Sequence, residues 1–446
     1  MSEYETREEA PASRKWYQAI GPGIITACVV IGPGSILTSS KIGAANEFSM
    51  IWIVVIACIF MMFFMSMGAR VGVVAKSSPA NLIRQHLNGP LGKVLAIIVG
   101  ISVFCISTAF QFGNNLGVQS AFNVYLDKEI TIYLVLLFNA LSISFLFAFK
   151  DFYKALEKVM MAFVGLMLLC FAINLIFAKP NLGAFAKGFL PLDAEISLDT
   201  LGLVGTTFVV AAAYFQCYLA RQKGWSVNEL KNGLVDARVG SIIMATLTIM
   251  LMATAGTVLV GQSLGNVEDV AAGLEPAFGE TGKLLFCIGL FSAAYSSFLV
   301  NSMIAGFILS DGLQLGSTAG EKGPKIITTI VLITGMVVAL AVIQIGFDPV
   351  PAVVFAQAVT VIGNPLLAGM LLWFTNNKKI MGDRTNGPIT NTVGVLGIVI
   401  LLVMAYRTAF VQIPQKLETL NEKSSVEQVE QLPETSDEIT TNKPEE

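Results

Sequence analysis

Backbone and side-chain oxygens that could bind a small cargo gather at an interruption in one apolar segment, Gly32-Pro33-Gly34-Ser35. Proline removes a backbone donor and clashes with the preceding turn, while glycine makes unwinding cheap. In lipid, an unwound backbone is tolerated only where it faces protein or a water-filled cavity. The freed carbonyls at Val29 and Gly32, with the Ser35 hydroxyl, are ligands that a hard cation accepts. A purely structural kink is the alternative, because glycine and proline are common in membrane helices.

Other polar side chains lie in apolar segments and are further candidate ligands. The amides are the stronger candidates, because an amide is costly in hydrocarbon and tends to face the bundle interior. For a serine or threonine, a bond to its own helix is the alternative, and for a cysteine it is inert packing. The candidates are Thr38, Ser39, Thr206, Thr207, Gln111, Asn114, Asn115, Gln357, Thr360 and Asn364, with Cys28 and Cys217 close to the expected breaks.

Composition excludes most other functions. Of 446 residues, 54% are apolar and 13% are charged, with a mean hydropathy of +0.70, whereas a soluble domain holds roughly a quarter charged residues. His86 is the only histidine, in a polar stretch expected to be a loop, and the six cysteines form no CxxC pair. We therefore expect a helical membrane protein that is no enzyme, needs no cofactor and binds no nucleic acid.

The elements that must position these residues are apolar runs of about 20 residues, the length that a bilayer core requires. Eleven such runs predict eleven transmembrane helices, at 18–45, 50–75, 93–122, 130–149, 153–178, 200–221, 236–261, 283–313, 325–346, 350–375 and 391–411. Three domains follow: a cytoplasmic segment 1–17, a transmembrane domain 18–411 and a disordered acidic tail 412–446.

The cationic residues predict the orientation, since lysine and arginine favour cytoplasmic connections. With the amino terminus inside, the outer connections carry only Lys128, Lys179, Lys187 and Lys283. The inner connections carry nineteen: Arg7, Arg14, Lys15, Arg70, Lys76, Arg84, Lys93, Lys150, Lys154, Lys158, Arg221, Lys223, Lys231, Arg238, Lys322, Lys325, Lys378, Lys379 and Arg384. An odd number of spans then places the carboxyl terminus outside. Three acidic residues near inner span ends, Glu157, Asp236 and Asp311, are expected to cap helices or to pair with Lys154, Arg238 or Lys322.

An internal repeat of five plus five spans is also predicted. The sixth span, 200–221, carries Gly202, Gly205 and Thr206-Thr207 and follows the broken first span by five. Interrupted spans at matching positions in two halves indicate an inverted-repeat transporter. The sixth span gives the weaker signal, because it has no proline and contains three consecutive alanines after the threonines.

Several motifs resemble the Nramp family of divalent-metal transporters, across roughly residues 18–411. They are Gly21-Pro22-Gly23, Ile31-Gly32-Pro33-Gly34-Ser35, Ile42-Gly43-Ala44, Ala69-Arg70-Val71-Gly72, Leu156-Glu157, Lys179-Pro180-Asn181-Leu182-Gly183, Lys187-Gly188, Ala293-Ala294-Tyr295-Ser296-Ser297, Ala305-Gly306, Gln357 and Pro365. The resemblance implies a leucine-transporter-like fold of all-α polytopic type, with metal held between unwound spans one and six. At these two spans we predict Val29, Gly32, Ser35, Thr206, Val209 and Gln357 as metal residues. From the chemistry of their side chains, we predict Cys28, Thr38, Thr207, Asn114, Asn115, Cys217 and Asn364 as pathway residues.

The sequence departs from the family where the family's chemistry is concentrated. The aspartate and asparagine of the first-span motif align with Gly32 and Ser35, and the sixth-span methionine-proline-histidine with Val209-Val210-Ala211. Two acidic residues of the family's proton route align with Ser107 and Phe110, and the arginines expected in span nine are absent from 326–345. The carboxylate that neutralises a dication and the thioether that favours transition metals are thus replaced.

The leading hypothesis is a plasma-membrane transporter or facilitator of divalent cations that works by alternating access without tight proton coupling. It is expected to act as a monomer surrounded by lipid. One alternative is a carrier for a small organic solute such as an amino acid, whose carboxylate could lie at helix amino termini. Another is a sensor that kept the fold and lost transport, although the tail offers no large output domain.

Overall fold

The computed structural model describes residues 20–87, 89–149, 151–191, 198–345, 350–415 and 418, and these residues are overwhelmingly helical. An apolar chain in lipid must satisfy its backbone hydrogen bonds internally, which a helix does. The helices are α2 (Pro22–Val30), α3 (Pro33–Asn46), α4 (Ile51–Val74), α5 (Pro79–His86), α6 (Pro90–Asn123), α7 (Lys128–Ala148), α8 (Phe152–Ala178), α9 (Leu182–Lys187), α10 (Leu198–Thr207), α11 (Val210–Lys223), α12 (Leu230–Val258), α13 (Val267–Gly312), α14 (Lys322–Ile345), α15 (Val350–Asn376), α16 (Lys378–Met381) and α17 (Pro388–Arg407).

Nine of the eleven predicted spans are matched by candidate spans within these residues, if the bent pair α2 and α3 counts as one. The other two correspond to α7 and α15. In α7 the continuous run of described side chains is apolar over 132–148, and in α15 the side chains of 350–362 are not described. The predicted segment 1–17 lies outside the described residues. So does most of the tail 412–446, although helical structure continues from α17 to residue 415.

The first break lies where the sequence predicts it. α2 ends at Val30, α3 begins at Pro33, and the two helices meet at 61°. Proline at the start of α3 costs no backbone hydrogen bond, because the N–H groups of the first helical residues have no acceptor within the helix. The same proline could not continue α2, and the predicted interruption of the first span is confirmed.

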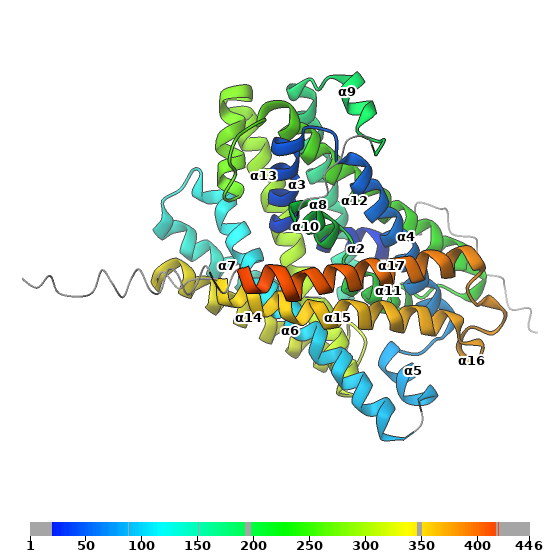
Figure 1. Ribbon diagram of the computed structural model, residues 1–446. Coiled ribbons are helices and arrows are strands. Elements are labelled where there is room, and N and C mark those ends of the chain that lie inside the picture. Colours follow the sequence, from blue (N-terminus) through cyan, green and yellow to red (C-terminus); the bar gives the residue numbers. More distant parts are fainter. Residues whose placement is uncertain are drawn as a thin grey trace, which may run out of the picture.

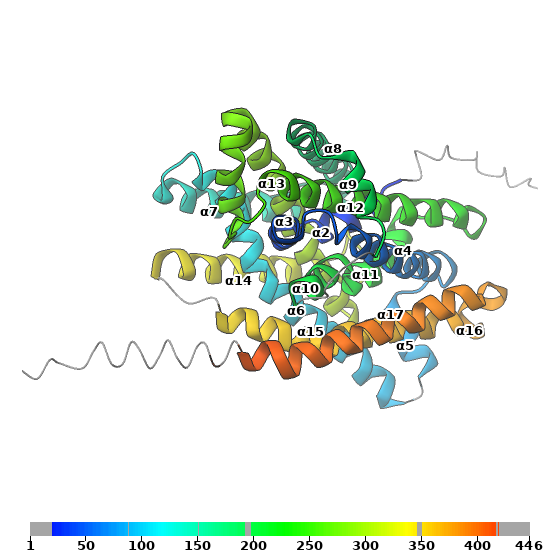
Figure 2. The ribbon, with the colours of Figure 1, turned by 45° about the horizontal axis from the view of Figure 1, so that its top comes forward.

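The second break divides the sixth span between Thr207 and Val210, and it separates α10 from α11. Phe208 still donates to the Val204 carbonyl at 2.7 Å, whereas Val209 has an extended backbone with ψ 91°. This break forms without a proline. The two broken spans lie together at the centre of the bundle, with α4, α12 and α13 around them (Figures 1 and 2). α14, α15 and α17 lie on one flank.

One helix is longer than predicted. α13 begins at Val267 in the segment expected to be an outer loop, and it continues to Gly312. Its first part is bent away from the rest at Gly279, where φ is 66°, a value that glycine adopts without strain. We call residues 267–278 the outer arm. Its Val270 and Leu274 are buried, so the arm packs onto the bundle.

Candidate functional site

The first break leaves two backbone carbonyls without their helical donors, and hydroxyl groups occupy both. Pro33 has no N–H for the carbonyl of Val29, four residues earlier. Instead, Ser297 of α13 donates its hydroxyl to that carbonyl at 3.3 Å. The Ser35 hydroxyl donates to the carbonyl of Val30. The Gly32 carbonyl, predicted as a ligand, accepts from the Ile36 N–H at 3.0 Å and keeps one lone pair for a further partner.

The two breaks meet at Ser35. Its hydroxyl lies 3.4 Å from the carbonyl oxygen of Thr206 at the end of α10. The Thr206 side chain instead bonds the Leu203 carbonyl of its own helix at 3.1 Å, the alternative considered from the sequence. Thr38 is half-buried, and its methyl group lies near Gly202 of α10. Because the single hydroxyl hydrogen of Ser35 is donated to Val30, its approach to Thr206 is a contact between the first and sixth spans and not a second hydrogen bond.

A network of amides extends from the break into α6, α7 and α13. Gln111 lies at its centre: its Oε1 accepts from Asn114 Nδ2 at 3.2 Å and from Asn301 Nδ2 at 3.0 Å, and its Nε2 donates to a carbonyl of α13. Asn115 donates to the Gln111 carbonyl at 3.0 Å and accepts from Asn139 Nδ2 at 2.7 Å. All five are buried or half-buried. Buried amides with partners are rigid, so this network fixes one wall of the site.

The amide network adjoins the break at Ser297, whose Oγ lies 3.3 Å from Asn114 Oδ1 and whose single hydrogen serves either this oxygen or the Val29 carbonyl. Gly32 lies against the same two groups. A Cβ atom built at Gly32 would lie 2.9 Å from Ser297 Oγ and 3.6 Å from Asn114 Oδ1. A side chain at residue 32 would therefore press on the Ser297 hydroxyl, which would have to turn or shift.

The remaining predicted site residues have less connection to the break. Cys28 is fully buried, with its Sγ 3.9 Å from the Met160 carbonyl, and Cys217 is 1% exposed, so both pack as small apolar groups. Thr207 is buried and Val209 is half-buried beside the second break. Asn364 is half-buried in α15. The side chains of Gln357 and Thr360 lie outside the described residues.

Sequence reasoning missed Ser297, Asn301 and Asn139 as parts of the site. The two asparagines could have been found by the criterion that selected Asn114 and Asn115, because each is an amide within a predicted apolar span. Among the described residues, no three His, Cys, Asp or Glu side chains lie close enough together to hold a metal ion. The donors around the break are accordingly neutral oxygens.

A buried carboxylate holds the beginning of α2, at the end of the bundle predicted to face the cytoplasm. Asp236 of α12 accepts from the Gly21 N–H at 2.8 Å and from the Gly23 N–H at 2.7 Å. Gln216 of α11 donates to the same carboxylate at 3.2 Å, and Thr26 of α2 donates to Gln216 at 2.6 Å. A carboxylate at a helix amino terminus is stabilised by the free N–H groups and the helix dipole.

Two more acidic residues make similar connections near this end. Asp311 accepts from the Ser78 hydroxyl at 2.6 Å, the Ala80 N–H at 3.0 Å and the Tyr218 hydroxyl at 2.8 Å. Glu157 pairs with Lys223 of α11. Capping and pairing were expected, but the expected partners were wrong.

The expected partners were Lys154, Arg238 and Lys322, which are near in sequence. Lys154 pairs with Asp151, and the true partners come from other helices. His86, expected in a loop, is instead the last residue of α5.

Two broken spans that meet at a polar site within an all-helical bundle define a membrane protein of the secondary-transporter class. Comparison with known proteins gives the family. The Natural resistance-associated macrophage protein-like family, Nramp, matches residues 23–410, and the chain belongs to this family. A divalent metal cation transporter MntH of Pectobacterium carotovorum subsp. carotovorum is 25% identical over 400 residues, which cover 86% of this chain and 92% of the relative.

Solved structures support the fold. The manganese transporter of Eremococcus coleocola, in complex with an aromatic bis-isothiourea substituted compound, superposes with a TM-score of 0.74 at 18% identity, covering 94% of this chain and 93% of that one. MhsT in complex with L-phenylalanine gives a TM-score of 0.54 at 14% identity, covering 84% of this chain and 98% of that one. The leucine-transporter-like fold predicted from the sequence is confirmed.

Proposed function

We propose that this protein is a secondary transporter or facilitator that moves divalent metal cations across a membrane by alternating access. Its membership of the Nramp family and the names of its MntH relatives support this proposal. The observation that carries it is the meeting of the two breaks at Ser35, beside the carbonyl of Val29 and the Ser297 hydroxyl. Spans that break at one point can move their halves separately and expose that point to either side in turn.

The donors favour a hard cation that keeps part of its water shell. The described groups at the break are carbonyl, hydroxyl and amide oxygens, with no carboxylate to neutralise a dication. Neutral oxygens suit Mg²⁺ and similar ions, which dehydrate reluctantly and retain several waters. The buried cysteines lie with their thiols in apolar packing, and so a soft transition-metal site is less well supported.

Transport without tight proton coupling follows from the residues on the family's proton route. Ser107 is buried, and its carbonyl accepts from Asn301 Nδ2 at 2.9 Å. Phe110 is 45% exposed on the same helix. Neither side chain titrates near neutral pH, and the amides around them exchange no protons in this range.

The remaining expectations are part of the same proposal. The protein is placed in the plasma membrane as a monomer, with the amino terminus in the cytoplasm and the carboxyl terminus outside. The excess of lysine and arginine on one side supports this orientation. The metal cation is the substrate, and membrane lipid is the surrounding partner.

Calorimetry tests the cargo, with Mg²⁺, Mn²⁺, Cd²⁺ and a set of amino acids as separate titrants of purified protein. The wild type should bind a divalent cation. The double variant Gly32→Asp with Ser35→Asn, which adds a carboxylate and an amide, should bind Mn²⁺ and Cd²⁺ more tightly. If neither protein binds a metal and the wild type binds an amino acid, the protein is an organic-solute carrier. Binding of nothing, with no uptake, would favour a sensor.

Proteoliposomes test the coupling. Cation uptake, recorded beside a pH-sensitive dye in the lumen, should leave the luminal pH almost unchanged. A proton flux that depends on the cation in a fixed ratio would contradict the uncoupled mechanism.

A further inference from the structure

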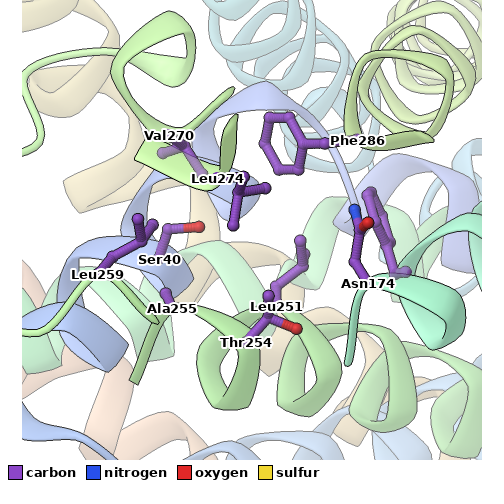
Figure 3. A pocket seen from close by; sticks show the side chains of 10 residues that line it. Ser40, Asn174, Leu251, Thr254, Ala255, Leu259, Val270, Leu274 and Phe286 are labelled. Atoms are coloured by element: carbon purple, nitrogen blue, oxygen red, sulfur yellow. The ribbon is translucent and has the colours of Figure 1, made fainter. Parts of the chain in front are cut away.

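A small cavity lies away from the breaks, beneath the outer arm of α13 (Figure 3). Apolar side chains make up most of its wall, including Leu274 from the arm and Phe286 from the helix beyond the bend. Three polar side chains complete it: Ser40 of α3, Asn174 of α8 and Thr254 of α12. The cavity offers about 10 Å³ to the centre of a water molecule, at the lower end of the room that one water requires.

Asn174 is the unusual member of this wall. Its side chain is 1% exposed, and neither its Nδ2 nor its Oδ1 has a hydrogen-bond partner among the described residues. The amide is drawn beside the cavity opposite Ser40 and Thr254 in Figure 3. Leaving a buried polar group without a partner costs about 1–3 kcal/mol, so two such groups on one side chain indicate that something else satisfies them.

The chemistry of the amide selects the occupant. A cation would satisfy Oδ1 and leave the Nδ2 donors unpaired, whereas an anion would do the reverse. Water both donates and accepts, and it is held in proteins by two to four polar partners. The hydroxyls of Ser40 and Thr254 supply further partners of either kind. No charged side chain lines the cavity, which also argues against an ion.

We propose that this cavity is a binding site for one ordered water, which bonds the Asn174 amide and the hydroxyls of Ser40 and Thr254. The water thereby joins the outer half of the first broken span to α8 and α12. The outer arm covers part of the site through Val270 and Leu274.

Radiolytic footprinting with mass spectrometry tests the site in the wild-type protein. Hydroxyl radicals formed from a bound water oxidise the side chains beside it, even when bulk solvent has no access. Phe171 and Phe286, which line the cavity and are 1% and 2% exposed, should be oxidised several-fold faster than Phe374, which is 0% exposed and lies elsewhere. Equal, slow oxidation of all three would show that the cavity is dry and overturn the proposal.

The variant Asn174→Leu tests whether the amide holds the water, as opposed to water entering the cavity without being bound. Leucine has a similar volume but no polar group, so oxidation of Phe171 and Phe286 should fall towards that of Phe374. Unchanged fast oxidation would show that water needs no amide, and the proposed site would be wrong. Thr254→Val, which keeps the shape and removes one hydroxyl, should give a smaller decrease and serves if the leucine variant does not fold.

Discussion

Replacing Asp236 by asparagine should release the beginning of α2. The two carboxylate oxygens accept separately, one from the Gly21 N–H and the other from the Gly23 N–H. An asparagine offers one oxygen and one NH₂ group. Whichever way its amide is turned, the NH₂ faces one of these N–H groups, and a bond to a charged acceptor is lost.

The size of the effect follows from that lost bond. A hydrogen bond to a charged group contributes about 1.5–3 kcal/mol. If the released α2 is in rapid exchange with the packed form, the population of the released form rises by about 10- to 150-fold, because each 1.4 kcal/mol is tenfold. Repulsion between the two facing donors would add to this increase.

Alkylation of native cysteines by N-ethylmaleimide measures the release. Cys28 lies on α2 and is 0% exposed, so it reacts only when α2 leaves its position. Its rate in Asp236→Asn, followed by peptide mass spectrometry, should rise by the factor above. Cys170 on α8, which is 1% exposed, is the internal control and should keep its wild-type rate. A parallel rise at both cysteines would indicate general unfolding, and an unchanged rate at Cys28 would refute the reasoning.

Three other predictions follow. Gly32→Ala should strongly lower cation uptake, since its methyl group would lie 2.9 Å from the Ser297 hydroxyl oxygen. Gly34→Ala should transport like the wild type, because a methyl group at residue 34 would have no neighbouring atom within 4 Å. Equal uptake by both variants would argue against a site at the break. A cysteine at Ser436 in a cysteine-free background should react with an impermeant maleimide on intact cells, and reaction only after permeabilisation would contradict an outer carboxyl terminus. Burial raises the pKa of Glu321, but hydrogen bonds to its carboxylate outweigh burial and hold this pKa below the usual value. A depressed pKa in the folded state gives stability that is lost as the pH falls through it, so the Tm values of wild type and Glu321→Gln should differ at neutral pH and converge in acid.

The broken first span could be predicted from the sequence because its cause is local. Pro33 prevents continuation of α2 whatever surrounds it. The second break has no such local cause, since Phe208 and Val209 are followed by alanines that favour helix. Its surroundings come from other spans, such as Ser35 of α3, whose hydroxyl lies 3.4 Å from the Thr206 carbonyl at the end of α10. The sequence indicates the second break only because the sixth span occupies the position in the second half of the chain that the broken first span occupies in the first half.

In the site, too, features with a local cause could be predicted, whereas contacts between distant parts of the chain could not. Asn114 and Asn115 could be selected because an amide in an apolar span needs a partner. The identity of the partner could not be predicted, as Asp236 shows: the residues that it binds, Gly21 and Gly23, are more than two hundred positions away in sequence. The prediction that these acidic residues need partners was correct. The predicted partners, Lys154, Arg238 and Lys322, were wrong because they were chosen for being near in sequence.

The hydroxyls at the first break have a consequence for the lifetime of a bound cargo. The Val29 and Val30 carbonyls already accept from Ser297 and Ser35, so a cation that takes these oxygens competes with one hydroxyl donor at each. Only the surplus over the displaced bonds appears as affinity. The hydroxyls can return as the cation departs, which lowers the barrier to dissociation. Such a site exchanges its ion quickly and retains it poorly, as suits a protein whose task is turnover and not storage.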